Sequence, residues 1–125
     1  MDIAIVGLGR MGANMARRLH RGGHRVVAFN RSPDKTRQIM NEGLEGAFSA
    51  DEVVSKLATP RVVWVMVPAG EATESTIQEF AALLRPGDTM VDGGNSNFHD
   101  SKRRAADMAR RGLGFVDAGV SGGIW

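Results

Sequence analysis

Short apolar runs alternate with longer amphipathic stretches along the whole chain, without an internal repeat or a low-complexity segment. Short, continuous apolar runs are typical of strands buried on both faces of a parallel sheet. The stretches between them repeat apolar residues every three or four positions, which is typical of helices. This alternation predicts an α/β fold in which a doubly wound, mostly parallel sheet carries helices on both faces.

The pattern predicts six strands, the third of them weak, and five helices. The strands are expected over residues 3–6, 25–30, 45–48, 61–67, 89–92 and 113–117. The helices are expected over residues 10–21, 33–41, 50–57, 71–84 and 96–111. One apolar face is expected to pack on the sheet in the first helix (Met11, Met15, Leu19) and in the fourth (Ile77, Phe80, Ala81, Leu84).

A glycine-rich motif, Gly7-Leu8-Gly9-Arg10-Met11-Gly12, joins the first strand to the first helix. In this context, G-x-G-x-x-G is the dinucleotide-binding fingerprint of a Rossmann-like fold. We expect Gly7 to make the tight turn, Gly9 to let a pyrophosphate approach the backbone, and Gly12 to let the helix pack on the strand. The phosphates would bind the free N–H groups at the helix start. The alternative is a structural turn without a ligand.

The end of the second strand indicates which dinucleotide binds. NAD sites usually carry an acidic residue there, which accepts a hydrogen bond from the ribose 2′-OH. This chain has Asn30-Arg31-Ser32 instead, and a guanidinium binds a 2′-phosphate that a carboxylate would repel. The sequence therefore favours NADP, with NAD as the alternative. Ser32 is expected both to cap the next helix and to donate to the phosphate.

Two further strand ends carry candidate residues, in Val67-Pro68-Ala69-Gly70 and in Asp92-Gly93-Gly94-Asn95-Ser96. Ligands of open α/β sheets bind outside the carboxyl ends of the strands, so both loops are expected to border the same crevice. The amide of Asn95 suits a hydroxyl or a carboxamide, and its alternative role is to form a turn. Ser96 is expected to cap the last helix.

Composition and charge exclude several classes of protein. The chain has 125 residues, 42% of them hydrophobic and 24% charged, which is typical of one globular domain. A net charge of +2 is too small for an electrostatic nucleic-acid binder, and neither a targeting segment nor a membrane span is expected. The absence of cysteine excludes thiolate metal sites and suits a reducing cytoplasm. The three histidines lack metal-ligand spacing, so no metal is expected.

Taken together, the loops resemble those of the decarboxylating 6-phosphogluconate dehydrogenases over the whole chain. The order and spacing match at the fingerprint, at Asn30-Arg31-Ser32, at the two later loops and at Gly119-Val120-Ser121-Gly122-Gly123. Related 3-hydroxyisobutyrate dehydrogenases usually carry Asp-x-Ser-Thr in place of the Asp-Gly-Gly-Asn-Ser found here. Gly9, Pro68 and Ile124-Trp125 depart from the longer form of the family and resemble its shorter bacterial branch, some members of which use NAD.

The resemblance implies the site residues. Cofactor contacts would be made by Gly7 to Gly12, Asn30, Arg31, Ser32, Val67, Pro68, Ala69 and Asn95, and substrate contacts by Asn95, Ser121, Gly122 and Gly123. It implies an NADP-dependent oxidoreductase of the cytoplasm that acts on a phosphorylated sugar acid, 6-phosphogluconate, in gluconate utilisation and the pentose phosphate pathway. The whole enzyme would be a homo-oligomer.

The same resemblance implies that catalysis needs a Lys and a Glu from a helical domain beyond residue 125. No residue of this chain matches either one, so no catalytic residue is assigned, and Lys35, Lys56 and Lys102 are expected to be solvated. The chain is accordingly expected to be a dinucleotide-binding domain that is inactive alone. The alternatives are another β-hydroxyacid dehydrogenase, of the 3-hydroxyisobutyrate type, and a non-catalytic module that senses NAD(P).

Overall fold

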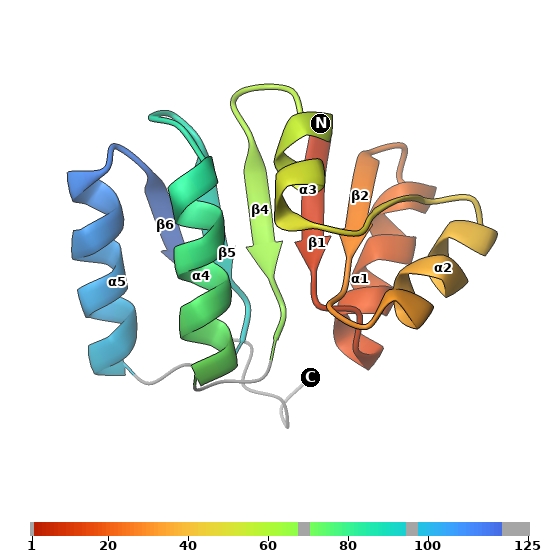
Figure 1. Cartoon of the computed structure of the whole chain (residues 1–125), viewed down its shortest axis with the longest axis horizontal. Helices are drawn as coiled ribbons and strands as arrows, with labels where there is room; N and C mark the ends of the chain where they lie inside the picture. Colours follow the sequence, from red (N-terminus) through yellow and green to blue (C-terminus); the bar gives the residue numbers. More distant parts are fainter. Residues whose placement is uncertain (1, 68–70, 95–97, 119–125) are drawn as a thin grey trace.

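The computed structural model describes residues 2–67, 71–94 and 98–118 of the chain. Strands and helices alternate along these residues, as the sequence predicts (Figure 1). The strands are β1 (Asp2–Val6), β2 (Arg25–Phe29), β3 (Glu45–Ala47), β4 (Val62–Val65), β5 (Thr89–Asp92) and β6 (Gly114–Asp117). The helices are α1 (Arg10–Arg21), α2 (Pro33–Asn41), α3 (Ala50–Lys56), α4 (Glu71–Leu83) and α5 (Phe98–Arg110).

The six strands form one sheet in the order β3-β2-β1-β4-β5-β6, and each pair of neighbours is parallel. The strand order reverses beside β1, the first strand, which pairs with β2 on one side and with β4 on the other. This is the topology of a Rossmann fold, in which ligands bind at the reversal point, outside the carboxyl ends of the strands. In Figure 1 the arrows of β1, β4 and β6 point to that edge.

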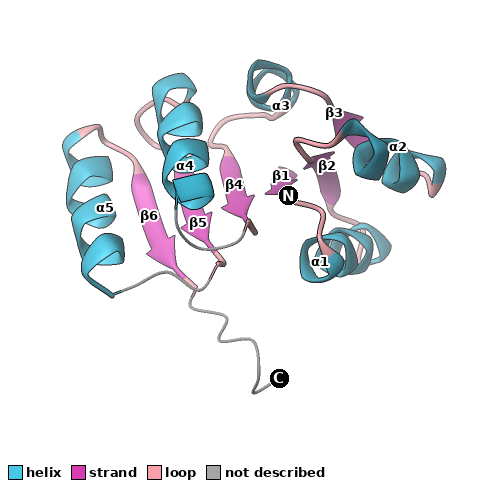
Figure 2. Ribbon diagram, turned by 60° about the horizontal axis from the view of Figure 1, so that its bottom comes forward, coloured by secondary structure: helices cyan, strands magenta, loops and turns pink. Residues whose placement is uncertain are grey.

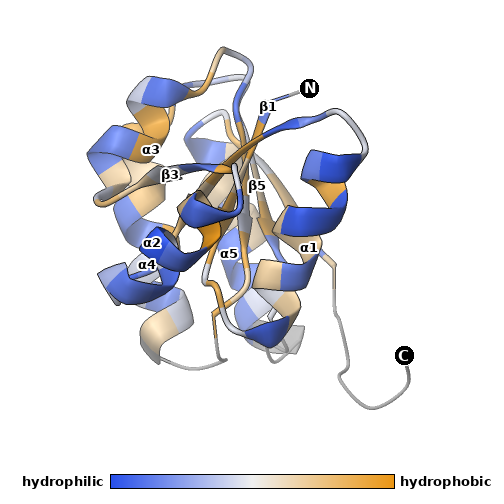
Figure 3. Ribbon diagram, turned by 90° about the vertical axis from the view of Figure 1, so that its right-hand side faces the viewer, coloured by the Kyte–Doolittle hydropathy of each residue, from blue (hydrophilic) through white to orange (hydrophobic). Residues whose placement is uncertain are grey.

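Two apolar cores lie on opposite faces of the sheet, which confirms the doubly wound arrangement. Side chains of α3, α4 and α5 contribute to one core, and side chains of α1 and α2 contribute to the other. Figure 2 shows α1 on one side of the sheet and α3 and α4 on the other. Apolar residues follow the strands and polar residues follow the outer helix faces (Figure 3). None of the helices in the described part of the chain is long and apolar enough to cross a membrane.

The apolar faces predicted for α1 and α4 can be compared with the residues that are buried in the structure. The predicted face of α4 is confirmed, because Ile77, Phe80 and Ala81 are buried, as is Leu84 directly after the helix. In α1 the prediction is wrong for Met11, whose side chain is 46% exposed. The buried line of α1 runs through Gly12 and Ala16 instead, with Met15 and Leu19 only partly buried. Small residues take this line because the helix lies close to β1.

The helix ends differ from the predictions in one respect. Ser32 is the N-cap residue of α2, but among the described residues its hydroxyl makes no capping hydrogen bond, so its predicted role as a side-chain cap is wrong. By contrast, Ser49 caps α3, since its Oγ accepts a hydrogen bond of 3.1 Å from the Glu52 amide. The capping prediction for Ser96 lies outside the described residues.

Candidate functional site

Loops from several strands are tied together at the carboxyl edge of the sheet. The Gly7 amide donates to the Phe29 carbonyl over 2.8 Å, so the loop after β1 is bound to the end of β2. The Met66 amide donates to the Val6 carbonyl over 2.6 Å, which fixes the end of β4 beside β1. The Gly93 amide donates to the Val65 carbonyl over 2.9 Å, which adds the loop after β5. These bonds extend the sheet ladder and hold four strand ends beside the start of α1.

The three fingerprint glycines differ in the space around them: Gly7 and Gly12 have no room for a side chain, whereas Gly9 does. Gly7 has a φ of +100°, and an added Cβ would lie 2.6 Å from the Met66 carbonyl oxygen, so only glycine fits this turn. At Gly12 an added Cβ would overlap the carbonyl oxygen of Gly7, as expected where a helix packs closely on a strand. At Gly9 no atom of the described residues lies within 4 Å of an added Cβ. The backbone at Gly9 is therefore open to a ligand.

The start of α1 is electrostatically suited to an anion. Gly9 is its N-cap residue, and the first turn carries no acidic side chain. The first amides of a helix have no carbonyl partner within the helix, and the helix dipole adds positive potential at this end. Phosphate groups bind to such helix starts in Rossmann folds.

Asn30 connects the first two loops of the site. Its side-chain oxygen accepts a hydrogen bond of 2.8 Å from the Leu8 amide, and its side-chain nitrogen donates to the Ser32 carbonyl over 3.2 Å. The Asn30 amide in turn donates to the Thr36 hydroxyl over 3.1 Å. The Asn30 carboxamide is thus engaged with the protein itself, and it aligns the glycine loop with the loop after β2. The sequence predicts only a cofactor contact for Asn30 and not this structural role.

Two cavities lie against these loops. The first has a volume of about 200 Å³ and a mostly apolar lining, made by Val6, Gly7, Phe29, Asn30, Arg31, Val67, Ala72 and Thr76. The second has a volume of about 210 Å³ and a strongly basic lining, made by Leu8, Gly9, Arg10, Ala13, Arg17, Lys35, Gln38 and Ile39. An apolar cavity beside a basic one suits a ligand that combines a flat ring with phosphate groups.

The Arg31 side chain reaches across the apolar cavity to α4. Its Nη2 atom donates to Thr76 Oγ1 and to Glu79 Oε1, both over 3.1 Å. Thr76 is buried, whereas the side chains of Arg31 and Glu79 are 57% and 43% exposed. The predicted phosphate-binding guanidinium is therefore present at the cavity, but it holds an ion pair within the protein.

The structure brings together seven of the predicted cofactor residues as cavity linings: Gly7, Leu8, Gly9, Arg10, Asn30, Arg31 and Val67. Met11 and Ser32 are exposed beside them. Pro68, Ala69, Asn95 and the Ser121-Gly122-Gly123 segment lie outside the described residues. Lys35, which the sequence analysis expected to be merely solvated, lines the basic cavity. Its place in the first turn after the β2 loop was the signal that could have identified it.

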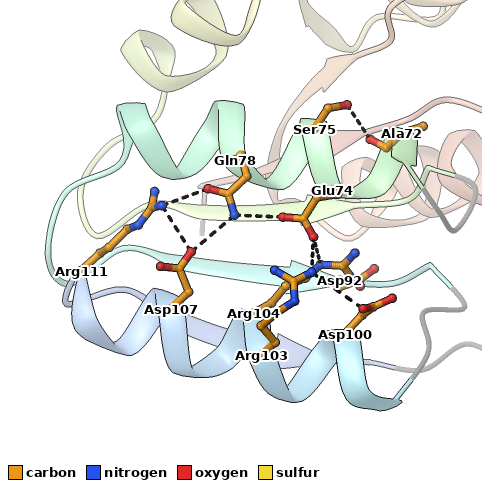
Figure 4. A network of polar contacts seen from close by, with 10 residues as sticks. All are labelled: Ala72, Glu74, Ser75, Gln78, Asp92, Asp100, Arg103, Arg104, Asp107 and Arg111. Atoms are coloured by element: carbon orange, nitrogen blue, oxygen red, sulfur yellow. Dashed lines mark hydrogen bonds and ion pairs between the residues drawn. The ribbon is translucent and has the colours of Figure 1, made fainter.

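A network of charged groups supports the loop after β5 (Figure 4). Asp92 is fully buried, its Oδ1 accepts a hydrogen bond of 2.9 Å from the Gly94 amide, and its Oδ2 lies 3.5 Å from Nη1 of the buried Arg104. Arg104 also donates to Glu74 on α4 over 3.0 Å, and Arg103 donates to the same carboxylate over 2.7 Å. The network therefore ties α4 and α5 to the strand end that leads to Asn95.

The Glu74 carboxylate makes stability depend on pH. Burial alone would raise the pKa of Glu74, but hydrogen bonds from Arg103, Gln78 and Arg104 outweigh burial and lower the pKa from 4.5 to about 2. Since the folded state has the lower pKa, the stabilisation is complete above about pH 5 and is lost as the pH falls toward 2. We expect Glu74→Gln to lower the free energy of unfolding by about 2 kcal/mol at pH 7 and by almost nothing near pH 2. Solvent screens part of the interaction, because the Glu74 side chain is 30% exposed.

Urea unfolding of both proteins between pH 7 and pH 2 measures this difference. Glu45→Gln is the matched control, because Glu45 makes an exposed ion pair with Arg25 away from this network. If the stability difference between wild type and Glu74→Gln stayed constant over the whole pH range, Glu74 would not be the source of the pH dependence.

Comparison with known protein families identifies one match, the family described as the NAD binding domain of 6-phosphogluconate dehydrogenase, over residues 2–125. Among curated proteins, the chain is 42% identical over 124 residues to the decarboxylating 6-phosphogluconate dehydrogenase of a Synechocystis species. That alignment covers 95% of this chain and 26% of the relative. The chain thus spans about a quarter of the length of the curated relatives it matches.

Solved structures that share the fold of this chain include two different dehydrogenases. The Mycobacterium tuberculosis 3-hydroxyisobutyrate dehydrogenase superposes with a TM-score of 0.86 and 32% identity, over 98% of this chain and 41% of that one. The Plasmodium falciparum 6-phosphogluconate dehydrogenase, described with NADP+ and with 6-phosphogluconate, superposes with a TM-score of 0.85 and 26% identity. The second alignment covers 92% of this chain and 26% of that one.

Proposed function

The chain belongs to the family of NAD-binding domains of 6-phosphogluconate dehydrogenase, and from this premise we propose that it binds NADP for an enzyme that oxidatively decarboxylates 6-phosphogluconate. One observation carries the proposal of a dinucleotide site. The backbone of Gly9 is open at the start of α1, where the first turn carries no acidic side chain. Beside it, the loop after β2 carries Arg31 instead of an acidic residue. Phosphates are favoured at the first feature and a 2′-phosphate at the second.

Each part of NADP has a complementary surface at this edge. The apolar cavity between β1, β2 and α4 suits the adenine ring, since its lining is mainly aliphatic and aromatic. The amides at the start of α1 suit the pyrophosphate. Arg31 suits the 2′-phosphate, and Ser32 and Lys35 lie on the same loop and helix start to assist it. NAD remains the alternative cofactor because it lacks only the group that Arg31 would bind.

We propose that the substrate is a phosphorylated sugar acid bound by Asn95, Ser121, Gly122 and Gly123, with Pro68 and Ala69 beside the cofactor. When bound, the nicotinamide supplies a hydride acceptor for oxidation of the substrate hydroxyl. The domain's own part is to bind and orient the two molecules, and the buried Asp92 holds the backbone that leads to Asn95. A helical domain would contribute the catalytic Lys and Glu, and the whole enzyme would be a cytoplasmic homo-oligomer.

The purified 125-residue chain is expected to bind NADPH but not to turn over 6-phosphogluconate, because it contains no residue that matches the catalytic Lys or Glu. Isothermal titration with NADPH and with NADH tests binding. Formation of NADPH from NADP+ and 6-phosphogluconate, followed by absorbance, tests turnover. Measurable turnover by this chain would refute the assignment of catalysis to another domain, and absence of binding to either dinucleotide would refute the proposed site.

A second candidate is a dehydrogenase of the 3-hydroxyisobutyrate type, favoured by the structural similarity to the Mycobacterium tuberculosis enzyme. Both candidates use the same nucleotide site, so the cofactor loops do not separate them. The loop after β5 does, since Asp92-Gly93-Gly94-Asn95 resembles the sugar-acid branch. A test of 6-phosphogluconate against 3-hydroxyisobutyrate with the full-length enzyme decides between the two.

A further inference from the structure

Arg31 holds its ion pair through a single nitrogen atom. Nη2 donates both to Thr76 Oγ1 and to Glu79 Oε1, each over 3.1 Å. An Nη2 atom has two hydrogens, so these two contacts use its full donor capacity. Thr76 is buried and lines the apolar cavity, while Glu79 lies one turn further along α4 at the surface. The Thr76 hydroxyl and the Glu79 carboxylate therefore hold the guanidinium against α4.

This contact matters because of the shape of a guanidinium group. It can bind two oxygens at once through Nε and Nη2 or through Nη1 and Nη2, and both forks include Nη2. Arg17 makes the first kind of fork in this protein, where Nε and Nη2 bind the two Glu42 oxygens over 2.7 and 2.9 Å. With Nη2 engaged by α4, Arg31 has neither fork available for a phosphate.

We propose that Glu79 is a specificity-determining residue that competes with the 2′-phosphate of NADP for Arg31, an inference that rests on the proposed function. A bidentate bond from Arg31 to the 2′-phosphate requires Nη2 to leave Glu79. The freed carboxylate then lies near a second negative charge, which opposes NADP further. NAD has no 2′-phosphate and leaves the Arg31–Glu79 pair intact. Glu79 therefore weakens binding of NADP but not binding of NAD.

Glu79→Gln tests the inference, because glutamine keeps the length of the side chain and removes its charge. Isothermal titration of the 125-residue chain uses adenosine 2′,5′-bisphosphate and adenosine 5′-monophosphate, which differ only in the 2′-phosphate, followed by NADP+ and NAD+. We expect the two 2′-phosphorylated ligands to bind about twofold to fivefold more tightly, the upper part of the range for an exposed ion pair. The gain should shrink as the ionic strength rises.

Two controls assign the effect. Glu45→Gln removes a similarly exposed carboxylate from an ion pair with Arg25. This pair lies where β2 and β3 begin, at the end of the strands opposite to the proposed site, so the substitution should change the affinity for neither kind of ligand. In an Arg31→Met background, Glu79→Gln should no longer tighten binding of adenosine 2′,5′-bisphosphate, because the competition acts through Arg31.

The outcomes separate this inference from the function on which it rests. A selective gain for 2′-phosphorylated ligands that depends on Arg31 supports competition. No gain, a loss, or an equal gain for both kinds of ligand overturns it, even if the wild-type chain binds NADP+ well. A wild-type chain that binds none of the four ligands overturns the proposed function together with the inference.

Discussion

Replacing Arg31 with aspartate is expected to weaken NADP+ binding by about 100-fold or more, and NAD+ binding by much less. The substitution removes the one cation among the described residues that line the apolar cavity, and it places a carboxylate where the 2′-phosphate would bind. Loss of charge-assisted hydrogen bonds and the new repulsion act in the same direction. For NAD+ the new carboxylate can instead accept a hydrogen bond from the ribose 2′-OH, as in most NAD sites.

Isothermal titration of both dinucleotides with the wild type and the variant measures the switch. Arg37→Asp is the matched control, since Arg37 is an exposed arginine of α2 that is absent from the described lining of both cavities. Its side chain pairs with Asp34 over 3.4 Å and lies 5.7 Å from the centre of the Phe48 ring. The control should leave the ratio of the two affinities unchanged. Equal weakening of NADP+ and NAD+ by Arg31→Asp would remove Arg31 as the 2′-phosphate contact.

Stability should change little in the Arg31→Asp variant, which keeps the binding result interpretable. Arg31 contributes an ion pair whose two side chains are both exposed, and such pairs contribute about 1 kcal/mol or less. Thermal unfolding of the variant checks this point before the titrations. A large loss of stability would mean that the Arg31 contact with α4 has a structural role as well.

Replacing Gly12 with alanine is expected to destabilise the fold by about 3 kcal/mol or more. The added Cβ would overlap the Gly7 carbonyl oxygen and contact Met66 Cβ at 3.4 Å, so α1 must move away from β1. The same movement displaces the amides at the start of α1, so dinucleotide binding should be lost with stability. Urea unfolding followed by circular dichroism measures the first effect.

Gly9→Ala is the matched control within the same motif. Gly9 has a φ of −65°, which alanine adopts without strain, and within the described part of the chain nothing lies within 4 Å of the added Cβ. Its stability should stay within about 1 kcal/mol of the wild type. Equal stabilities of the Gly9 and Gly12 variants would mean that the helix adjusts freely, and that close packing is not the reason for Gly12.

Fold class, the order of the elements and the position of the nucleotide site follow from local patterns. About twenty consecutive residues contain the apolar run of β1, the glycine motif and the amphipathic α1. Each of these patterns depends only on the spacing of apolar residues or on the turn residues within its own segment. The roles of Gly7 and Gly12 could be predicted for the same reason. The resemblance of the later loops to the 6-phosphogluconate dehydrogenases predicts the family that the match over residues 2–125 confirms.

Pairings between distant segments could not be predicted in this way. Arg31 and its partner Glu79 are 48 positions apart, and the ion pair between Asp92 and the buried Arg104 joins a strand end to a helix. The sequence predicts Arg31 as a cation at the right strand end, but it assigns the guanidinium only to the 2′-phosphate and not to a partner on α4. Whether a charged side chain meets solvent, a ligand or another residue depends on which helices pack beside it.

The sequence alone specifies a Rossmann-like dinucleotide-binding domain with a basic residue where NAD sites carry an acid. Four features depend on the folded chain: Met11 is exposed, Gly12 and Ala16 pack on the sheet, Asn30 connects two loops, and α4 holds Arg31. Periodicity and turn chemistry act within a segment, whereas burial and charge pairing depend on distances between segments, which are set only when the chain folds.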